Sequence, residues 1–520
     1  MENEILEEKF IDWRGRDTIP EKHGGIRAAS IAYVVELLEI MVSIAIGNNM
    51  VLYFMKSMHY SPAEAANMVT NFIGTSYLLT LFGGFVADSF LTRSTTFIIF
   101  CSIEILGLLV LTFQAHYPNL QPEGNKTPST LQSTVLFTGL YLFAFGTGGT
   151  RPSLLAHGGD QFDSRHQREI SKFFNWYFFF VCFGWLMAIT VMAWIKELFN
   201  ISIVLLAIAL CIFALGLPLY RFKRPSGSPL TRIANVFISA ARYRNGSVLD
   251  VEMMQSLTFT DNNIHHHNKL KCLDKALLNK NISATQVEET RTFIGLLPIF
   301  LSTIVMNTCV AQLLTFTVQQ GMTMNRKFSS SMEIPVPSLN VISIIFILAF
   351  ISLYELFGKS INRTSSFSLK RIGLGLTLSS ISMAVAAIVE AKRKYEAVQN
   401  DVRISVFWLM FQYLMLSFSD ILTLGGMQEF FYREAPASMK SMSIALGWCS
   451  IAMGFFLSSL LVAVTNTVSG WLGHQWLGGE DLNKSRLDLF YVLKSTSREL
   501  ELLLDYMTYS YANILLDQIG

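Results

Sequence analysis

Charged side chains are scarce in this sequence. Asp, Glu, Lys and Arg make up 15% of its 520 residues, whereas soluble globular proteins carry about 25%. The two signs nearly balance, at a net charge of +2, which excludes a strongly basic nucleic-acid-binding protein and an acidic disordered chain. Hydrophobic residues make up 51%. The composition therefore predicts an integral membrane protein whose main solvent is the lipid bilayer.

Residues that carry redox, metal or covalent chemistry are also few. The six cysteines form neither a disulfide framework nor a zinc-binding pattern. Residues 265–267 are three consecutive histidines, but no cysteine or carboxylate cluster accompanies them, so ordinary loop sequence is the better interpretation. No nucleophile elbow or phosphate-binding loop lies in a hydrophobic run. We therefore expect no enzyme activity, no catalytic residue, no metal and no bound cofactor.

Hydrophobic runs long enough to cross a bilayer recur along the chain. About 20 apolar residues are needed, because the hydrocarbon core is about 30 Å thick and a helix rises about 1.5 Å per residue. Six such runs precede a polar stretch, and five clear runs and one weaker run follow it. The runs lie near residues 30–55, 68–88, 95–115, 131–151, 174–196, 200–220, 292–318, 338–358, 369–391, 404–428, 440–465 and, for the weaker one, 488–511.

The polar stretch between the two sets of runs is rich in Lys and Arg, which indicates that it lies in the cytoplasm. With six spans before it, the N-terminus lies there too. A group of basic residues in 390–403 falls on the outer side and does not fit this rule. Six spans on each side of a cytoplasmic loop is the layout of the major facilitator superfamily, in which two helix bundles enclose a site near the membrane midplane.

We therefore predict an all-α integral membrane fold of two six-helix bundles, 28–220 and 292–511. The twelfth helix is predicted only from the weaker run. A cytoplasmic tail, 1–27, precedes the bundles, the cytoplasmic loop 221–291 joins them, and a short tail, 512–520, follows. Within the loop, SPLTRIANVFISAARYR places apolar residues on one helical face and arginines on others. It is either a helix that lies on the inner membrane surface or a solvated linker helix.

Ionisable residues inside spans are costly, so they indicate functional sites that face the bundle interior. Glu36 and Glu39 lie three residues apart, on one face of the first helix, and Arg151 ends the fourth run. Two acids buried on one face cannot easily both stay ionised, whereas a nearby guanidinium favours their charged form. We predict that these three residues meet, either to exchange protons during transport or as a static ion pair. Glu104 and Glu355 are isolated acids in the third and eighth runs.

Several long stretches carry a resemblance to a known family. They include NFIGTSYLLTLFGGFVADSFLTR, GLYLFAFGTGGTRPSLLAHGGDQFD, FTVQQGMTM and MQEFFYREAPASMKSMSIAL. Over about residues 25–490 the sequence resembles the plant nitrate and peptide transporter family, relatives of the proton-dependent oligopeptide transporters. The resemblance implies a multi-pass plasma-membrane transporter that is driven by the proton gradient and needs no other cofactor. Relatives mostly work as single chains and some as dimers, so we expect a monomer, with a dimer as the alternative.

The resemblance also implies roles for the charged residues of the spans. Glu36 and Glu39 match the two acids of the family's first-helix motif, which serve proton coupling, but Ile40 stands where the family has a basic residue. Arg151 stands where the family usually has a lysine that contacts the carboxylate of the substrate. An arginine keeps this charge and adds a two-pronged donor that suits a carboxylate or a nitrate ion.

Further residues are assigned by the same resemblance. Asp420 matches an acid that in peptide carriers faces the amino end of the peptide. Gln319 and Gln320 lie beside the place where bacterial peptide carriers have an acid in the seventh helix, so they are candidate substrate contacts. Asp88 and Arg93 match the loop that is commonly taken to hold the cytoplasmic face shut, and we assign them to gating.

The first helix looks most like the branch of the family that imports abscisic acid and, in some members, gibberellins. A weak organic acid also fits the residues, because it offers a carboxylate to Arg151 and an apolar body to Met- and Phe-rich walls. Nitrate and peptides are alternative cargoes. A sensor or binding protein that does not transport is a further alternative, because of Ile40 and the unusual last run.

The last run carries a stripe of charge. Lys494, Arg498, Glu501 and Asp505 step by three or four residues and so share one helical face. Each Lys, Arg or Asp costs about 2.5–3.5 kcal/mol at the membrane centre. The stripe faces protein inside the membrane, or the segment lies on the membrane surface, or the C-terminus is a divergent ending. We favour insertion with the stripe facing inward.

Overall fold

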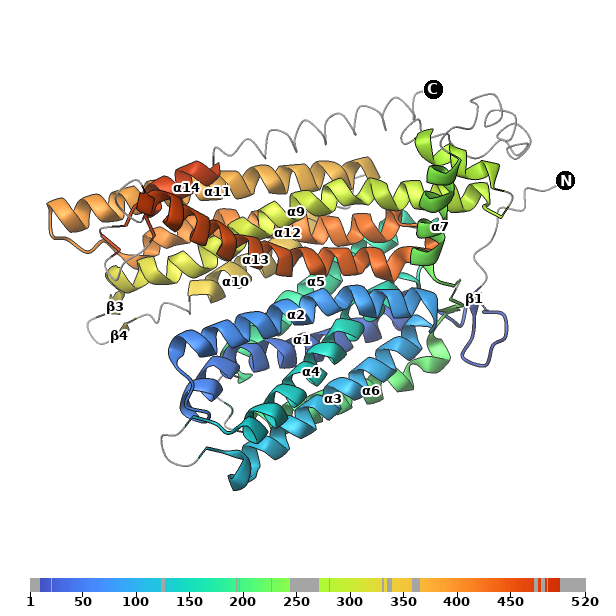
Figure 1. Ribbon diagram of the computed structural model, residues 1–520, viewed down its shortest axis with the longest axis horizontal. Helices are drawn as coiled ribbons and strands as arrows, with labels where there is room; N and C mark the ends of the chain where they lie inside the picture. Colours follow the sequence, from blue (N-terminus) through green and yellow to red (C-terminus); the bar gives the residue numbers. More distant parts are fainter. Residues whose placement is uncertain are drawn as a thin grey trace.

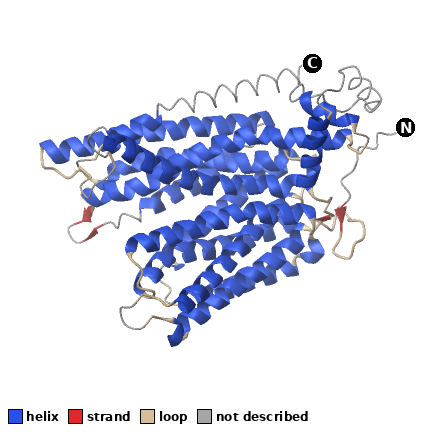
Figure 2. Ribbon diagram, in the orientation of Figure 1, coloured by secondary structure: helices blue, strands red, loops and turns tan. Residues whose placement is uncertain are grey.

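The computed structural model describes residues 10–19, 21–122, 127–163, 165–192, 195, 197–225, 227–243, 271–279, 281–329, 332–333, 339–357, 365–471, 476–477, 482–483 and 485–495. Within these residues the chain is almost entirely helical, and its long helices form two bundles (Figure 1; Figure 2). The bundles meet along α2 and α13 and along α5 and α10, whose bounds are given below. The predicted all-α membrane fold of two helix bundles is confirmed.

The first bundle contains six helices. They are α1 (Gly25–Lys56), α2 (Pro62–Ser89), α3 (Arg93–His116), α4 (Thr130–Gly159), α5 (Gln167–Thr190) and α6 (Leu198–Leu215), with 3-10 turns η1 (Pro118–Leu120) and η3 (Leu217–Leu219) in the connections. Ser61 and Ser129 begin α2 and α4 with reciprocal caps, in which the hydroxyl and the side chain three residues later each satisfy a free backbone N–H. α3 packs along α4, and α1 packs against α5 and α6.

The second bundle is built in the same way. It contains α9 (Ala284–Thr323), α10 (Leu339–Phe357), α11 (Ser365–Gln399), α12 (Leu409–Glu434), α13 (Lys440–Trp471) and α14 (Leu487–Ser495), with turns η7 (Val406–Trp408) and η8 (Ala437–Met439). In the part of the chain that is described, ten helices are long and apolar enough to cross a membrane. α4 is not among these ten, and its glycine-rich half from Gly146 to Gly159 is instead buried among protein.

The connection between the bundles lies across one set of helix ends. There α7 (Pro229–Arg242) and the 3-10 segment η4 (Lys271–Leu278) pack on α9 through a shared apolar cluster. β1 (Phe10–Ile11) pairs antiparallel with β2 (Phe222–Lys223) at the same end, on the right in Figure 1. We call this the α7 end. β3 (Lys327–Ser329) and β4 (Met332–Glu333) pair at the opposite end.

The predicted loop helix exists as α7, and one face of it is docked on protein. Val236 is fully buried in the cluster with Leu273 and Leu277, whereas Phe237 and Ile238 are exposed. The helix is therefore not a linker that is solvated on all sides. Contact of its exposed apolar face with the membrane surface stays a prediction, and the histidine tract 265–267 lies outside the described residues.

Most of the basic residues in 390–403, which did not fit the rule for Lys and Arg in loops, lie within the long helix α11. This helix continues to Gln399, so most of them are helical residues that contact protein. Arg393 is buried and forms an ion pair with Glu390 at 2.7 Å, and Lys394 donates a hydrogen bond to the carbonyl oxygen of Ser485 at 2.7 Å. The orientation of the chain in the membrane stays a prediction.

Replacing Arg393 with Ala is expected to destabilise the second bundle by about 3–5 kcal/mol, because it leaves Glu390 buried without its partner. The exposed Arg403 is the matched control, and its replacement with Ala is expected to change stability by less than about 0.5 kcal/mol. Thermal unfolding of the purified variants in detergent measures both effects. Equal unfolding temperatures for the two variants would contradict the prediction.

The weaker last run begins inside the second bundle. Leu487, Phe490 and Tyr491 of α14 are fully buried in an apolar cluster with Phe316 of α9 and Met383 of α11. The start of this run is therefore packed against other helices and does not lie free on a surface. The charged stripe falls outside the described side chains, so its inward orientation stays a prediction.

Candidate functional site

Arg151 lies where the two bundles meet. It projects from α4, and its guanidinium carbon is 4.6 Å from the ring centroid of Tyr77 in α2 and 5.6 Å from that of Trp448 in α13. The two rings stack on each other with their centroids 6.1 Å apart. Cation–π contacts of this kind stabilise a guanidinium that has lost its water. The second bundle thus contributes an aromatic wall to a charged site in the first.

The two acids of α1 share this site. Glu39 Oε1 is 3.7 Å from Arg151 Nε and accepts a hydrogen bond from the Ser43 hydroxyl at 3.0 Å. Glu36 accepts a hydrogen bond from the hydroxyl of Tyr177 in α5. All of these side chains are more than nine-tenths buried. The structure therefore brings Glu36, Glu39 and Arg151 together.

Several polar atoms of the site have no hydrogen-bond partner among the described residues. They are Nε and Nη1 of Arg151, Nε1 of Trp448, and one carboxylate oxygen each of Glu36 and Glu39. A buried donor without an acceptor costs free energy. The donors of Arg151 form a planar fork, and two parallel bonds from such a fork to a carboxylate or a nitrate are strong. The site is therefore chemically suited to hold a small anion.

Glu104 is a third acid of the same region. In the sequence it is an isolated acid, because it stands alone in its run. In the structure it is fully buried in α3 and interacts electrostatically with Glu39, Arg151 and Glu36. A single acid in an apolar run carries no signal for its partners, since those depend on how α3 packs against α4.

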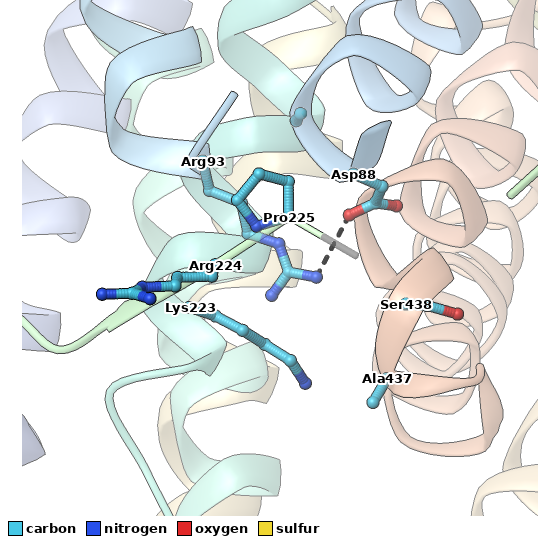
Figure 3. A pocket seen from close by; sticks show the side chains of 8 residues that line it. Asp88, Arg93, Lys223, Arg224, Pro225, Ala437 and Ser438 are labelled. Carbon is cyan, nitrogen blue, oxygen red and sulfur yellow. Dashed lines mark hydrogen bonds and ion pairs between the residues drawn. The ribbon is translucent and has the colours of Figure 1, made fainter. Parts of the chain in front are cut away.

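Asp88 and Arg93 lie at the α7 end, between the bundles (Figure 3). Arg93 forms ion pairs with Asp88, at 3.2 Å, and with Asp160, and its Nε donates to the hydroxyl of Ser441 at 2.8 Å. Asp88 accepts hydrogen bonds from the backbone N–H groups of Ser441 and Met442, at 3.3 and 2.8 Å. These N–H groups belong to the first turn of α13, where the helix dipole favours a negative charge. We call these five residues the latch.

Asp160 stays charged in the latch. Burial raises the pKa of this carboxyl group, but the nearby charges of Arg93, Lys440 and Lys223 outweigh burial and lower the pKa below its ordinary value. Tyr432 of α12 also donates a hydrogen bond to it at 2.8 Å. Because the pKa is lowered in the folded state, the stability that Asp160 contributes is present at neutral pH and is lost as the pH falls through the lowered value.

A second polar cluster joins the bundles through α5. Arg371 of α11 donates a hydrogen bond to Asn175 of α5 at 2.9 Å, and Asn175 donates to Glu355 of α10 at 2.6 Å. Arg371 is also 3.7 Å from Glu429 of α12. The sequence analysis missed this contact, because the partners lie about 180 and 196 residues apart along the chain and nothing local marks them as neighbours.

The remaining candidates have different surroundings. Gln320 is buried within the second bundle, where it donates to Glu390 at 2.8 Å and accepts from Gln412 at 3.2 Å, so its amide is engaged in supporting that bundle. Gln319 is exposed. Asp420 is half-buried and lies near Cys182 of α5, with Oδ1 free of hydrogen bonds to the described residues. Of the expected substrate contacts, only Arg151 lies in the site with Glu36 and Glu39.

A charged site buried between two helix bundles, and a latch that ties those bundles together at one end, are the features of a membrane transporter. Comparison with known proteins gives the family. Residues 94–477 match the model of the POT family. The chain belongs to the POT family, within its NRT1/PTR group, and this is a family of transporters and not of enzymes.

The relatives cover nearly the whole chain. It is 67% identical over 514 residues to Protein NRT1/PTR FAMILY 4.2 of Arabidopsis thaliana, across 97% of this chain and 98% of that protein. It is 63% identical over 499 residues to Protein NRT1/PTR FAMILY 4.1 of the same plant, across 94% and 96%. The crystal structure of the POT family transporter PepTSo superposes with a TM-score of 0.63 over 94% of this chain and 98% of the PepTSo chain. The two sequences are 18% identical, so the likeness shows a shared fold.

Proposed function

We propose that this transporter is a proton-coupled symporter that moves a small organic anion by alternating access. The observation that carries the proposal is the position of Arg151. Its guanidinium lies 3.7 Å from Glu39 and over two aromatic rings, one from each bundle. An anion on this guanidinium contacts both bundles, so its binding acts on their relative movement.

Proton coupling follows from competition for Arg151. An anion that binds the guanidinium displaces Glu39 as its partner and leaves this carboxylate buried without a counter-charge. An isolated buried carboxylate is costly and takes up a proton instead. Binding of the anion and binding of the proton therefore favour each other, and by reciprocity so do their releases. Ile40 is fully buried and contributes no charge, so this scheme needs only Arg151 as its cation.

The surroundings of Arg151 favour a cargo with an apolar body. Tyr33 belongs to the same apolar cluster as Tyr77 and Trp448, and it stacks on Phe173 and Phe180 at 5.4 and 5.2 Å between ring centroids. Aromatic walls around one charged group suit a weak organic acid of the abscisic acid or gibberellin type. Nitrate matches the guanidinium but makes no use of the rings, so it is the second candidate, and a peptide is the third.

The direction of opening is part of the proposal. We place the α7 end and the N-terminus in the cytoplasm and the protein, as a single chain, in the plasma membrane. The support is the excess of Lys and Arg in the loop that ends in η4. With the latch at that end, a cargo reaches the cytoplasm only after Asp88 and Arg93 have separated from the N-terminus of α13.

Uptake of a panel of labelled compounds tests the proposal. Abscisic acid, gibberellin, nitrate and a dipeptide are supplied to expressing oocytes in acidic and in neutral medium. We expect uptake of at least one weak organic acid, greater in acidic medium and reduced about tenfold or more by Glu39→Gln. Weak acids also cross membranes passively at low pH, so cells that express the Arg151→Ala variant are the control for carrier-mediated flux.

Uptake that does not depend on pH or on Glu39 would contradict the proposed proton coupling. Binding of a compound to the purified protein without flux would support the alternative, a sensor built on a transporter fold. That alternative rests on Ile40 and on the charged last run, and not on any contact in the described residues.

A further inference from the structure

Glu104 is a buried carboxyl group near Arg151 that the proposed function leaves without a task, and unlike Glu36 it accepts no hydrogen bond from the described residues. Its backbone is pressed against Gly146 of α4, where an added Cβ atom would lie 2.6 Å from Glu104 Cβ and 2.7 Å from its Cα. Only glycine tolerates so close an approach. This contact holds α3 against α4 one and a half turns from Arg151, and so keeps the acid near the guanidinium.

The carboxyl group of Glu104 lies in an apolar place. Neither of its oxygens accepts a hydrogen bond from the described residues, and the residue is fully buried. A carboxylate in such a place costs several kcal/mol unless it is paired or protonated. The cation with which it interacts electrostatically is Arg151, which already forms an ion pair with Glu39.

Among the described residues, the neighbouring helices provide no further counter-charge. The facing ionisable groups are Glu36 and Glu39 from α1, Arg151 from α4 and, on α3 itself, Cys101. α6, which packs on the other side of α3, has no acidic or basic side chain. α2 carries its charged residues near its ends, at Glu64 and in the latch. Three acids therefore share one guanidinium, and ionising all of them would leave a net charge of −2 in a dry site.

We propose that Glu104 is a third proton-binding group of this cluster, which takes up a proton when an anion occupies Arg151 and releases it after the anion has left. The inference rests on the proposed function. When the anion neutralises Arg151, all three carboxyl groups are neutral. When the anion leaves, Arg151 balances one carboxylate, and a second carboxylate is ionised only while water reaches the open site. Glu104 then adds a proton to the transport cycle beyond the one carried by Glu39.

The experiment compares the wild type with Glu104→Gln, which preserves shape and removes the proton site, and with Glu169→Gln, an exposed acid of α5, as the matched control. Infrared difference spectra of the protein in lipid nanodiscs, recorded against pH without any cargo, report protonated carboxyl groups through their C=O stretch. We expect a titrating band in the wild type and the control that is missing from Glu104→Gln. A band unchanged by the substitution, or one that does not titrate, overturns the proposal.

Transport by the same variants provides the second measurement, in proteoliposomes with labelled abscisic acid as the probe. For Glu104→Gln we expect uptake driven by a pH gradient to fall about tenfold or more, while exchange of labelled for unlabelled compound without a gradient stays close to the wild-type rate. Loss of both activities indicates a structural role and overturns the proposal. If the wild type does not transport the probe, the proposed function fails in that respect, and the infrared titration still decides the role of Glu104.

Discussion

Uptake of the cargo is expected to fall about thirtyfold or more in Arg151→Ala, because losing one partner of a buried, hydrogen-bonded charge pair costs binding about 2–5 kcal/mol and about 1.4 kcal/mol corresponds to a factor of ten. The substitution removes the proposed partner of the anion and leaves Glu39 buried without its counter-charge. Labelled uptake, corrected for the amount of protein at the cell surface, measures the effect.

Two companion variants separate binding from folding. Arg151→Lys keeps the charge but loses the planar fork, so we expect uptake between those of the wild type and the alanine variant. In Arg151→Ala combined with Glu39→Gln, the unpaired carboxylate is gone, so surface expression is expected to recover while uptake stays lost. Substantial uptake by Arg151→Ala itself would show that the anion is held elsewhere.

The latch is the second place where one substitution is expected to have a large effect. Arg93→Ala leaves Asp88 and Asp160 buried without the guanidinium that joins them, at a cost of about 3–5 kcal/mol. Both ion pairs lie within the first bundle, but Arg93 also donates to Ser441 of α13 and positions Asp88 against the start of that helix, so its loss weakens the contact between the bundles. The equilibrium should therefore shift toward opening at the α7 end. Arg165 is the matched control, because its ion pair with Asp163 is exposed and such pairs contribute about 0–1 kcal/mol.

A cysteine at position 438 reports this opening. Ser438 is buried in the pocket beside Asp88 and Arg93, and the exposed native thiols, Cys211 and Cys272, are replaced with Ser in all variants. We expect maleimide labelling of Ser438→Cys in nanodiscs to speed up about tenfold or more with Arg93→Ala and to stay unchanged with Arg165→Ala. Equal labelling rates in the two backgrounds would rule out a gating role for Arg93.

Features that depend on residues close together in the chain were predictable from the sequence, and features that depend on distant residues mostly were not. The spans were predictable because lipid demands about 20 apolar residues per crossing and leaves no alternative to helices. The pairing of Glu36 with Glu39 was predictable for a similar reason, since residues three apart on a helix share a face. Each of these signals is contained in a few consecutive residues.

Apart from the meeting of Arg151 with Glu36 and Glu39, contacts between helices were not predictable in this way. Arg371 meets Asn175 and Glu355 across the two bundles, and Trp448 comes to lie beside Arg151. Such contacts depend on the angle, depth and rotation at which helices pack, and an apolar run carries no local mark of any of these. Gln319 and Gln320 illustrate the point, because neighbours in the chain have opposite exposure.

The sequence by itself determined that the chain is a helical membrane protein, because scarcity of charge and the length of its apolar runs are properties of composition. It also determined which few ionisable residues the membrane would have to hold. Only the tertiary structure decided that Glu104 joins Glu36, Glu39 and Arg151. It also decided that Arg93 joins two aspartates at the start of α13. The reason is that the cost of a buried charge depends on which helix supplies its partner, and that helix can be distant in the chain.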